Sequence, residues 1–209
     1  MTDDNFLAIT NRFFKTEKLH AEPIGAGNIN DSYRIEFSEK NKKQVWLLQR
    51  LNHRIFPDPE AVMHNCSRVA EHLAAQPSFP LQIPSPQPGH DGQLLQRDAA
   101  GNYWRVFPFY ENTYAPENLP DPAVAYEAAR AYGIFLSALR SLPAANIRET
   151  ISGFHDTDRR WAAFLEVLKS NPVGRAAACQ PEIEALHAAN VVFEKISVLK
   201  KSGALPLRV

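Results

Sequence analysis

Hydrophobic and polar positions follow two different patterns along this chain, and the change divides it into two parts. Between Leu19 and Phe107, short apolar runs are separated by polar or glycine-containing turns, with one helical stretch among them. Such runs are typical of strands. Beyond Asn112, apolar residues recur every three or four positions over longer segments, which is typical of helices. The pattern predicts an α+β protein in which a β-rich part precedes a helical part.

The N-terminal part is predicted to begin with a helix and to contain five strands. The helix is expected near Asp4 to Thr16, with Phe6, Ile9 and Phe13 on one face. The strands are expected at residues 19–24, 32–37, 44–50, 93–97 and 103–107. Residues 77–89 contain five prolines and are expected to form an extended connection.

A second helix is predicted from Asp58 to Ala75, because its start has two local signals. Asp58 is suited to accept hydrogen bonds from the free N–H groups of the first turn, and Pro59 is suited to the first helical position. Four apolar residues at helical spacing are expected to form its buried stripe: Val62, Cys66, Val69 and Leu73.

Three further helices are predicted in the C-terminal part, at residues 122–142, 158–170 and 181–201. Residues 107–113 join the last strand to this part and are expected to act as a hinge. The expected domains are an N-terminal lobe of residues 1–108, and the hinge with a helical lobe at residues 109–209.

Charge and composition narrow the classes of function. Lys plus Arg and Asp plus Glu each number 23, so the formal net charge is zero, and this balance argues against a nucleic-acid partner. The chain has no apolar run of about 18 residues, and its first five residues lack the pattern of a signal peptide. Cys66 and Cys179 are the only cysteines, which favours reduced thiols. We therefore expect a cytoplasmic protein without a membrane segment.

The loop Gly25-Ala26-Gly27-Asn28 between the first two strands is the first candidate for chemistry. Glycines there allow the backbone to approach a ligand and to direct N–H groups at phosphate oxygens. The alternative is a hairpin with a flexible turn. A strand follows the loop, so it is not a dinucleotide fingerprint, and it lacks the Gly-Lys-Ser/Thr ending of a Walker A loop.

Two strands carry the next candidates. The apolar strand Val45 to Asn52 contains Arg50, which is suited to contact nucleotide phosphates or, alternatively, faces solvent from an edge strand. The aromatic strand Trp104 to Glu111 runs into the hinge and is suited to line an adenine pocket, or simply packs in the core.

The segment from Gly153 to Trp161 is the fourth candidate. Asp156, Thr157 or Asp158 either caps the following helix or faces a hydroxylated substrate. No metal site is predicted, because His64 and His72 lie eight residues apart without other ligands at suitable spacing. The sequence also has no Gly-x-Ser-x-Gly motif and no convincing Cys/His pair for nucleophilic catalysis.

Taken in order, these motifs resemble the phosphotransferase family of aminoglycoside, choline and homoserine kinases. The likeness rests on Gly-Ala-Gly-Asn-Ile-Asn-Asp-Ser-Tyr, Leu-Leu-Gln-Arg-Leu-Asn and Asp-Pro-Glu-Ala-Val-Met-His-Asn. Within this family the chain is most similar to the N-acetylhexosamine 1-kinase branch, with matching segments at residues 25–33, 48–52, 104–105 and 154–157.

The resemblance implies a protein-kinase-like fold, with an antiparallel five-stranded N-lobe, one main helix, a hinge and an incomplete helical C-lobe. It implies transfer of the γ-phosphoryl group of ATP, with Mg²⁺, to a sugar or another hydroxyl acceptor. The implied nucleotide-binding residues are Gly25, Ala26, Gly27, Asn28, Asn30, Arg50, Glu60, Phe107, Phe109, Tyr110 and Glu111. The implied substrate-binding residues are Asn28, His155, Asp156 and Arg159.

The chain departs from the family in three places. Gln49 and Arg50 stand where aminoglycoside kinases have a lysine on the third strand, and Asn28 stands where the sugar-kinase branch often has histidine. The catalytic loop His-x-Asp-x-x-x-x-Asn and the following magnesium-binding Asp are absent from the 209 residues. We therefore expect a truncated chain that has no catalytic or metal-binding residues, is inactive alone and self-associates through exposed core surface.

Two other interpretations of the sequence stay open. One is a non-catalytic nucleotide-binding, sugar-binding or scaffold module that ends at Val209. The other is an unrelated α+β interaction domain, which requires the motif matches to be accidental.

Overall fold

The computed structural model describes residues 3–25, 27, 29–113, 118, 121–205 and 209. The chain divides into two compact units, one comprising Met1–Ile151 with Arg208–Val209 and the other Ser152–Leu207. The predicted lobe boundary after residue 108 lies inside the first unit. No described helix is both long and apolar enough to cross a membrane.

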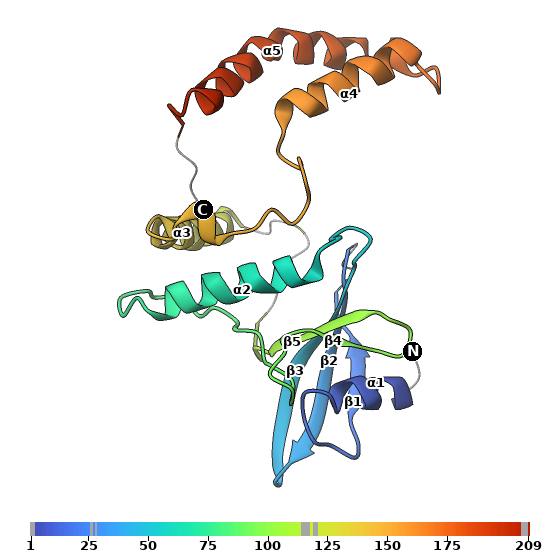
Figure 1. The fold of residues 1–209 in the computed structure, drawn as a ribbon, viewed down its shortest axis with the longest axis vertical. Coiled ribbons are helices and arrows are strands. Elements are labelled where there is room, and N and C mark those ends of the chain that lie inside the picture. The colour runs from blue at the N-terminus through green and yellow to red at the C-terminus, as the bar shows by residue number, and fades with distance from the viewer. Residues whose placement is uncertain (1–2, 26, 28, 114–117, 119–120, 206–208) are drawn as a thin grey trace. The chain divides into compact units, whose positions relative to one another are not determined.

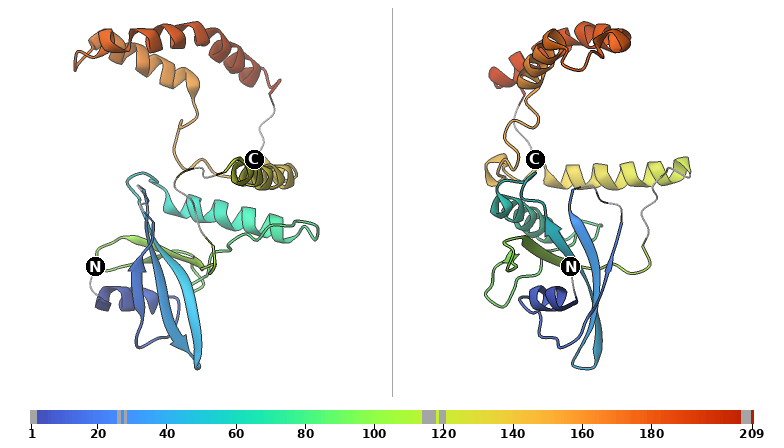
Figure 2. Two further views of the ribbon diagram at one scale, coloured as in Figure 1. Left: turned by 180° about the vertical axis from the view of Figure 1, so that it is seen from behind. Right: turned by 90° about the vertical axis from the view of Figure 1, so that its right-hand side faces the viewer.

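The first unit is built on a five-stranded sheet in which all neighbours are antiparallel (Figure 1). The strands are β1 (His20–Pro23), β2 (Asp31–Glu39), β3 (Lys42–Leu51), β4 (Gln96–Arg97) and β5 (Tyr103–Pro108), in the order β1-β2-β3-β5-β4. Figure 2 shows β2 and β3 as a long hairpin. The predicted five-stranded antiparallel sheet is confirmed.

β4 is shorter than the predicted strand at residues 93–97. The carbonyl of Gln93 accepts a hydrogen bond from the N–H of Gly89 at 2.8 Å, within the preceding connection and not across the sheet. Leu95 is buried against Met63 and Phe107, so its burial comes from packing and not from strand pairing.

α1 (Asp3–Thr10) covers one face of the sheet. Phe6 and Ile9 pack there with the sheet residues Ile35, Leu48, Trp104 and Val106. The predicted helical extension to Thr16 is wrong, because the chain turns after Thr10: the N–H of Phe13 bonds to the carbonyl of Thr10 at 2.9 Å. This turn buries Phe13 and places the Phe14 ring 4.8 Å from that of Trp46.

α2 (Pro59–Ala74) packs on the other face and begins as predicted. The Asp58 carboxylate accepts a hydrogen bond from the N–H of Ala61 at 2.9 Å, and Pro59 lies in the first turn. The predicted buried stripe is partly wrong: Val62 is only half-buried, whereas Met63 is buried against the sheet. The helix contacts the sheet through Met63 and the next helix of the chain through Leu73.

That helix, α3 (Pro122–Leu139), is followed by the short turn η1 (Ala144–Asn146). Leu139 and Leu142 pack against Leu73 of α2. The histidines of α2 also contact this segment: a His64 ring nitrogen lies 3.0 Å from the carbonyl oxygen of Asn146, and a His72 ring nitrogen lies 3.2 Å from that of Ala138.

The second unit contains α4 (Thr157–Ser170), the short turn η2 (Ala176–Cys179) and α5 (Gln180–Lys201). Its two helices are joined by ring contacts, with Trp161 lying 5.2 Å from His187 and 6.3 Å from Phe193 between ring centroids. The three C-terminal helices lie within a few residues of their predicted positions.

Candidate functional site

A cavity of about 320 Å³ lies where β5 ends and the predicted hinge begins. Its lining residues come from β3, from the proline-rich connection and from the hinge: Leu47, Gln49, Pro84, Phe107, Pro108, Phe109, Tyr110 and Thr113. The structure therefore brings together three of the residues predicted for nucleotide binding, namely Phe107, Phe109 and Tyr110. Apolar and aromatic walls suit a flat heterocyclic ring.

Charged side chains link the hinge to β2 and β3. Glu111 lies 3.7 Å from Arg34 and 3.9 Å from Lys43, measured between carboxylate oxygen and side-chain nitrogen. The Arg34 guanidinium also lies 5.6 Å from the centre of the Phe109 ring. Arg34 pairs with Glu36 at 2.8 Å, and this hydrogen bond raises the pKa of Arg34. The predicted residue Glu111 thus supports the position of the hinge.

The glycine loop connects β1 to β2. Gly25 has a φ of +70°, a backbone conformation that a side chain at this position would strain. The N–H of Ile24 donates to the carbonyl of Ser32 at 2.9 Å, and the Asn30 side chain accepts from the N–H of Asn52 at 2.9 Å. These bonds hold both ends of the loop against the sheet. Two of the predicted residues, Ala26 and Asn28, lie outside the described residues.

Behind the hinge cavity, Gln49 of β3 connects three strands. Its amide nitrogen donates to the Ser32 hydroxyl at 2.9 Å, and its amide oxygen accepts from Arg105 of β5 at 2.9 and 2.6 Å. The sequence analysis identified Gln49 only as a departure from a family pattern and gave Arg105 no role. The alternation of side chains along a strand could have indicated Arg105 as a site residue, because it places Arg105 on the same face of β5 as Phe107.

The predicted phosphate contact of Arg50 has no support in the structure. Arg50 lies on the same face of β3 as Leu48, which is opposite to the cavity-lining Leu47 and Gln49. Its guanidinium forms an ion pair with Asp31, with an Nε–Oδ2 distance of 2.7 Å. The predicted partner Glu60 is exposed in the first turn of α2 and forms no ion pair with another described residue.

The residues predicted for substrate binding lie in the second unit, at the start of α4. Asp156 caps this helix by accepting a hydrogen bond from the N–H of Arg159 at 3.0 Å, so the capping alternative is confirmed. His155 is exposed, with its ring 4.9 Å from that of Phe154. Asn28 lies outside the described residues.

A cavity of about 340 Å³ lies between α4 and α5 of the same unit, and Asp156 contributes to its lining. Beside it, Asp158 accepts hydrogen bonds from the Ser197 hydroxyl at 2.5 Å and from Lys201 at 2.9 Å. The bond from Ser197, followed by that from Lys201, lowers the pKa of Asp158. Asp158 thus has a structural role in joining the two helices.

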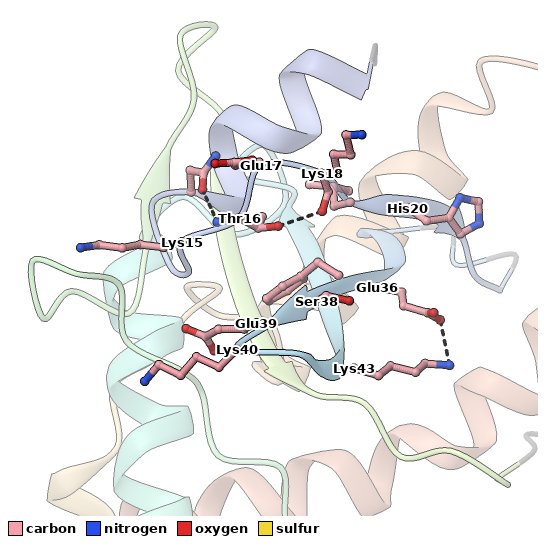
Figure 3. A pocket seen from close by; sticks show the side chains of 13 residues that line it. Lys15, Thr16, Glu17, Lys18, His20, Glu36, Ser38, Glu39, Lys40 and Lys43 are labelled. Carbon is pink, nitrogen blue, oxygen red and sulfur yellow. Dashed lines mark hydrogen bonds and ion pairs between the residues drawn. The ribbon is translucent and has the colours of Figure 1, made fainter.

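A larger groove, of about 1120 Å³, lies at the far end of the β2–β3 hairpin (Figure 3). Its lining residues carry both signs of charge, and Glu36 pairs with Lys43 at 3.0 Å. Figure 3 shows the amino groups of Lys15, Lys18 and Lys40 directed apart and not toward one point. This arrangement does not direct several positive charges at one anionic ligand.

Comparisons with known proteins indicate the family and the fold of the chain. A family described as the phosphotransferase enzyme family matches residues 20–198. Among solved structures, the chain is similar to a spectinomycin phosphotransferase in complex with ADP and spectinomycin, with a TM-score of 0.58 and 13% sequence identity. The match covers 94% of this chain and 58% of that chain. At this identity, the likeness shows a shared fold.

Proposed function

Since the chain belongs to the phosphotransferase enzyme family, we propose that its first unit is the nucleotide-binding part of an ATP-dependent small-molecule phosphotransferase. The observation that carries this proposal is the hinge cavity. There, residues predicted to bind the nucleotide, at the end of β5 and in the hinge, lie beside Leu47 of β3. The adenine ring would lie between Leu47 and the hinge aromatics. Backbone groups of residues 108–113 would form hydrogen bonds with the edge of the adenine ring.

The phosphates would then extend toward the glycine loop. Gly25, Ala26, Gly27, Asn28 and Asn30 belong to this part of the proposal. Backbone N–H groups in a glycine-rich turn are suited to phosphate oxygens. Arg50 and Glu60 are not used, because Arg50 pairs with Asp31 on the other face of the sheet and Glu60 has no pairing that supports a role.

The acceptor is proposed to be a hydroxyl compound, of which a sugar of the N-acetylhexosamine type fits the motif resemblance best. His155, Asp156 and Arg159 remain candidates for its recognition. The chain spans little more than half the length of the spectinomycin phosphotransferase. The catalytic-loop motif is not among the 209 residues, and within the described part no three His, Cys, Asp or Glu side chains are grouped as metal ligands. For these 209 residues alone we therefore propose ATP binding without turnover. The proposed location is the cytoplasm.

Leu47→Trp tests the adenine site, because the larger side chain would fill the cavity between β3 and the hinge. We expect wild-type protein to bind adenosine in isothermal titration calorimetry and Leu47→Trp to bind it at least about tenfold more weakly. The matched control is Leu19→Trp, which places the same side chain in the groove at the far end of the hairpin.

Both variants are checked by thermal unfolding, so that loss of binding is not confused with loss of the fold. Leu19→Trp is expected to bind adenosine as wild type does. Absence of adenosine binding to the wild type, or weakening by Leu19→Trp and not by Leu47→Trp, would contradict the proposed site.

A further inference from the structure

Arg105 differs from Arg34 of β2 and Arg50 of β3 in having no carboxylate partner, and from Arg97 of β4 in not being exposed. Arg34 and Arg50 form ion pairs with Glu36 and Asp31. No carboxylate oxygen of a described residue lies within ion-pair distance of Arg105, and its closest partner is the neutral amide of Gln49. On its other side are two sulfur atoms of α2, with Met63 at 3.6 Å and Cys66 at 3.8 Å.

This arginine is also half-buried. It lies between β5 and α2, 5.2 Å from the centre of the Phe107 ring. Burial lowers the pKa of Arg105, and the nearby Cys66 only partly opposes this effect. A neutral amide oxygen and two weak sulfur acceptors do not neutralise a cation. A desolvated cation of this kind is stabilised when an anion binds beside it.

The position of Gln49 indicates where such an anion would come from. Gln49 bonds Arg105 with one end of its amide and Ser32 with the other, so its orientation is fixed. It also lines the hinge cavity, and Ser32 follows the glycine loop at the start of β2. Arg105 does not line the cavity itself, but Gln49 links it both to the cavity and to the start of β2, beside which the phosphates of a nucleotide would lie.

We propose that Arg105 of β5, oriented by Gln49, contacts the phosphates of the bound nucleotide. This inference rests on the proposed function and assigns the cation of that site. Protein kinases use a lysine on the third strand for this purpose. Here the third strand supplies a neutral glutamine, and the cation comes from the neighbouring strand at the directly paired position, Gln49↔Arg105.

Comparison of adenosine with ADP isolates the phosphate contribution. In calorimetric titrations of the 209-residue chain, we expect ADP to bind at least about tenfold more tightly than adenosine, since charge-assisted hydrogen bonds to phosphate act only on ADP. Arg105→Met is expected to bring the two affinities within about threefold of each other, chiefly because ADP binds more weakly. Arg105→Lys should keep part of the preference, because it retains charge but loses the planar fork.

The double variant Arg105→Met with Gln49→Lys returns the cation to the third strand. We expect it to recover the preference for ADP, a result that a purely structural role of Arg105 would not produce. Arg68→Met, which removes an exposed arginine of α2, is the matched control and should behave as wild type. Thermal unfolding verifies each fold, and if Arg105→Met does not fold, the adenosine and ADP affinities of Arg105→Lys decide.

Two failures are distinguishable. If the wild type binds neither adenosine nor ADP, the proposed function is wrong, and the role of Arg105 with it. If adenosine binds but the preference for ADP survives in Arg105→Met, or falls in Arg50→Met instead, only the assignment of Arg105 is wrong.

Discussion

Asp98 stabilises the turn before β5. It also bonds directly to Trp104, a fully buried aromatic side chain of the sheet. Its carboxylate accepts hydrogen bonds from the backbone N–H of Asn102 and from the ring nitrogen of Trp104, both at 2.9 Å. Burial by itself raises the pKa of Asp98, but the hydrogen bonds from Asn102 and Trp104 outweigh it, and the net pKa is lowered. Trp104 is fully buried, so its N–H has no access to water.

Asp98→Ala is expected to reduce the free energy of unfolding by about 1–3 kcal/mol, because it leaves the Trp104 N–H buried without an acceptor. Urea unfolding at neutral pH measures the change. Asp98→Asn keeps an oxygen at this position and should lose less. Wild-type stability of Asp98→Ala would show that Trp104 finds another partner.

The lowered pKa also gives this contribution a pH dependence. Because the folded pKa lies below the unfolded value of about 3.9, the stabilisation is present above that value and is lost as the pH falls through the folded pKa. Asp98→Asn should not show this loss.

Single residues also show what the sequence could indicate about the site. The grouping of Phe107, Phe109 and Tyr110 in one place could be predicted, because they are close together in the chain and precede the change from a strand pattern to a helix pattern. The pairing of Gln49 with Arg105 was not, because it depends on the register between β3 and β5, residues 56 positions apart. Arg50 and Gln49 are neighbours in β3 and point to opposite faces, and Gln49 is the one that lines the hinge cavity.

At the scale of elements, local signals predicted starts better than ends. The start of α2 was predicted because Asp58 and Pro59 are next to the helix they begin. The end of α1 was not, because its position depends on Phe14 packing with Phe37 and Trp46, which lie far along the chain. The length of β4 was likewise set by pairing with β5 and not by its own residues.

Asp58→Ala tests how far α2 depends on its cap. We expect a loss of about 1 kcal/mol in the free energy of unfolding, because the N–H of Ala61 loses its side-chain acceptor. Chemical denaturation followed by circular dichroism measures it. Glu71→Ala, at an exposed position of the same helix, is the control and should change stability less. Equal effects of the two substitutions would contradict the importance of the cap.

At the scale of the whole molecule, the helical elements carry much exposed apolar surface. Tyr126 and Tyr132 of α3 are 68% and 62% exposed, and Val191 of α5 is 68% exposed. Exposed apolar side chains favour association, so self-association of the chain stays a prediction. The family resemblance, carried by motifs in both parts of the chain, is confirmed by the match over residues 20–198.

We propose above all that an adenine nucleotide binds at the hinge of the first unit. Hydrogen exchange of the backbone amides, measured by mass spectrometry with and without saturating ADP, tests it most directly. We expect slower exchange with ADP in residues 107–113 and in the peptide that contains Gly25 and Gly27. Residues 11–19, at the other groove, should exchange at an unchanged rate. Protection of residues 11–19 in place of the hinge, or no protection at all, would contradict it.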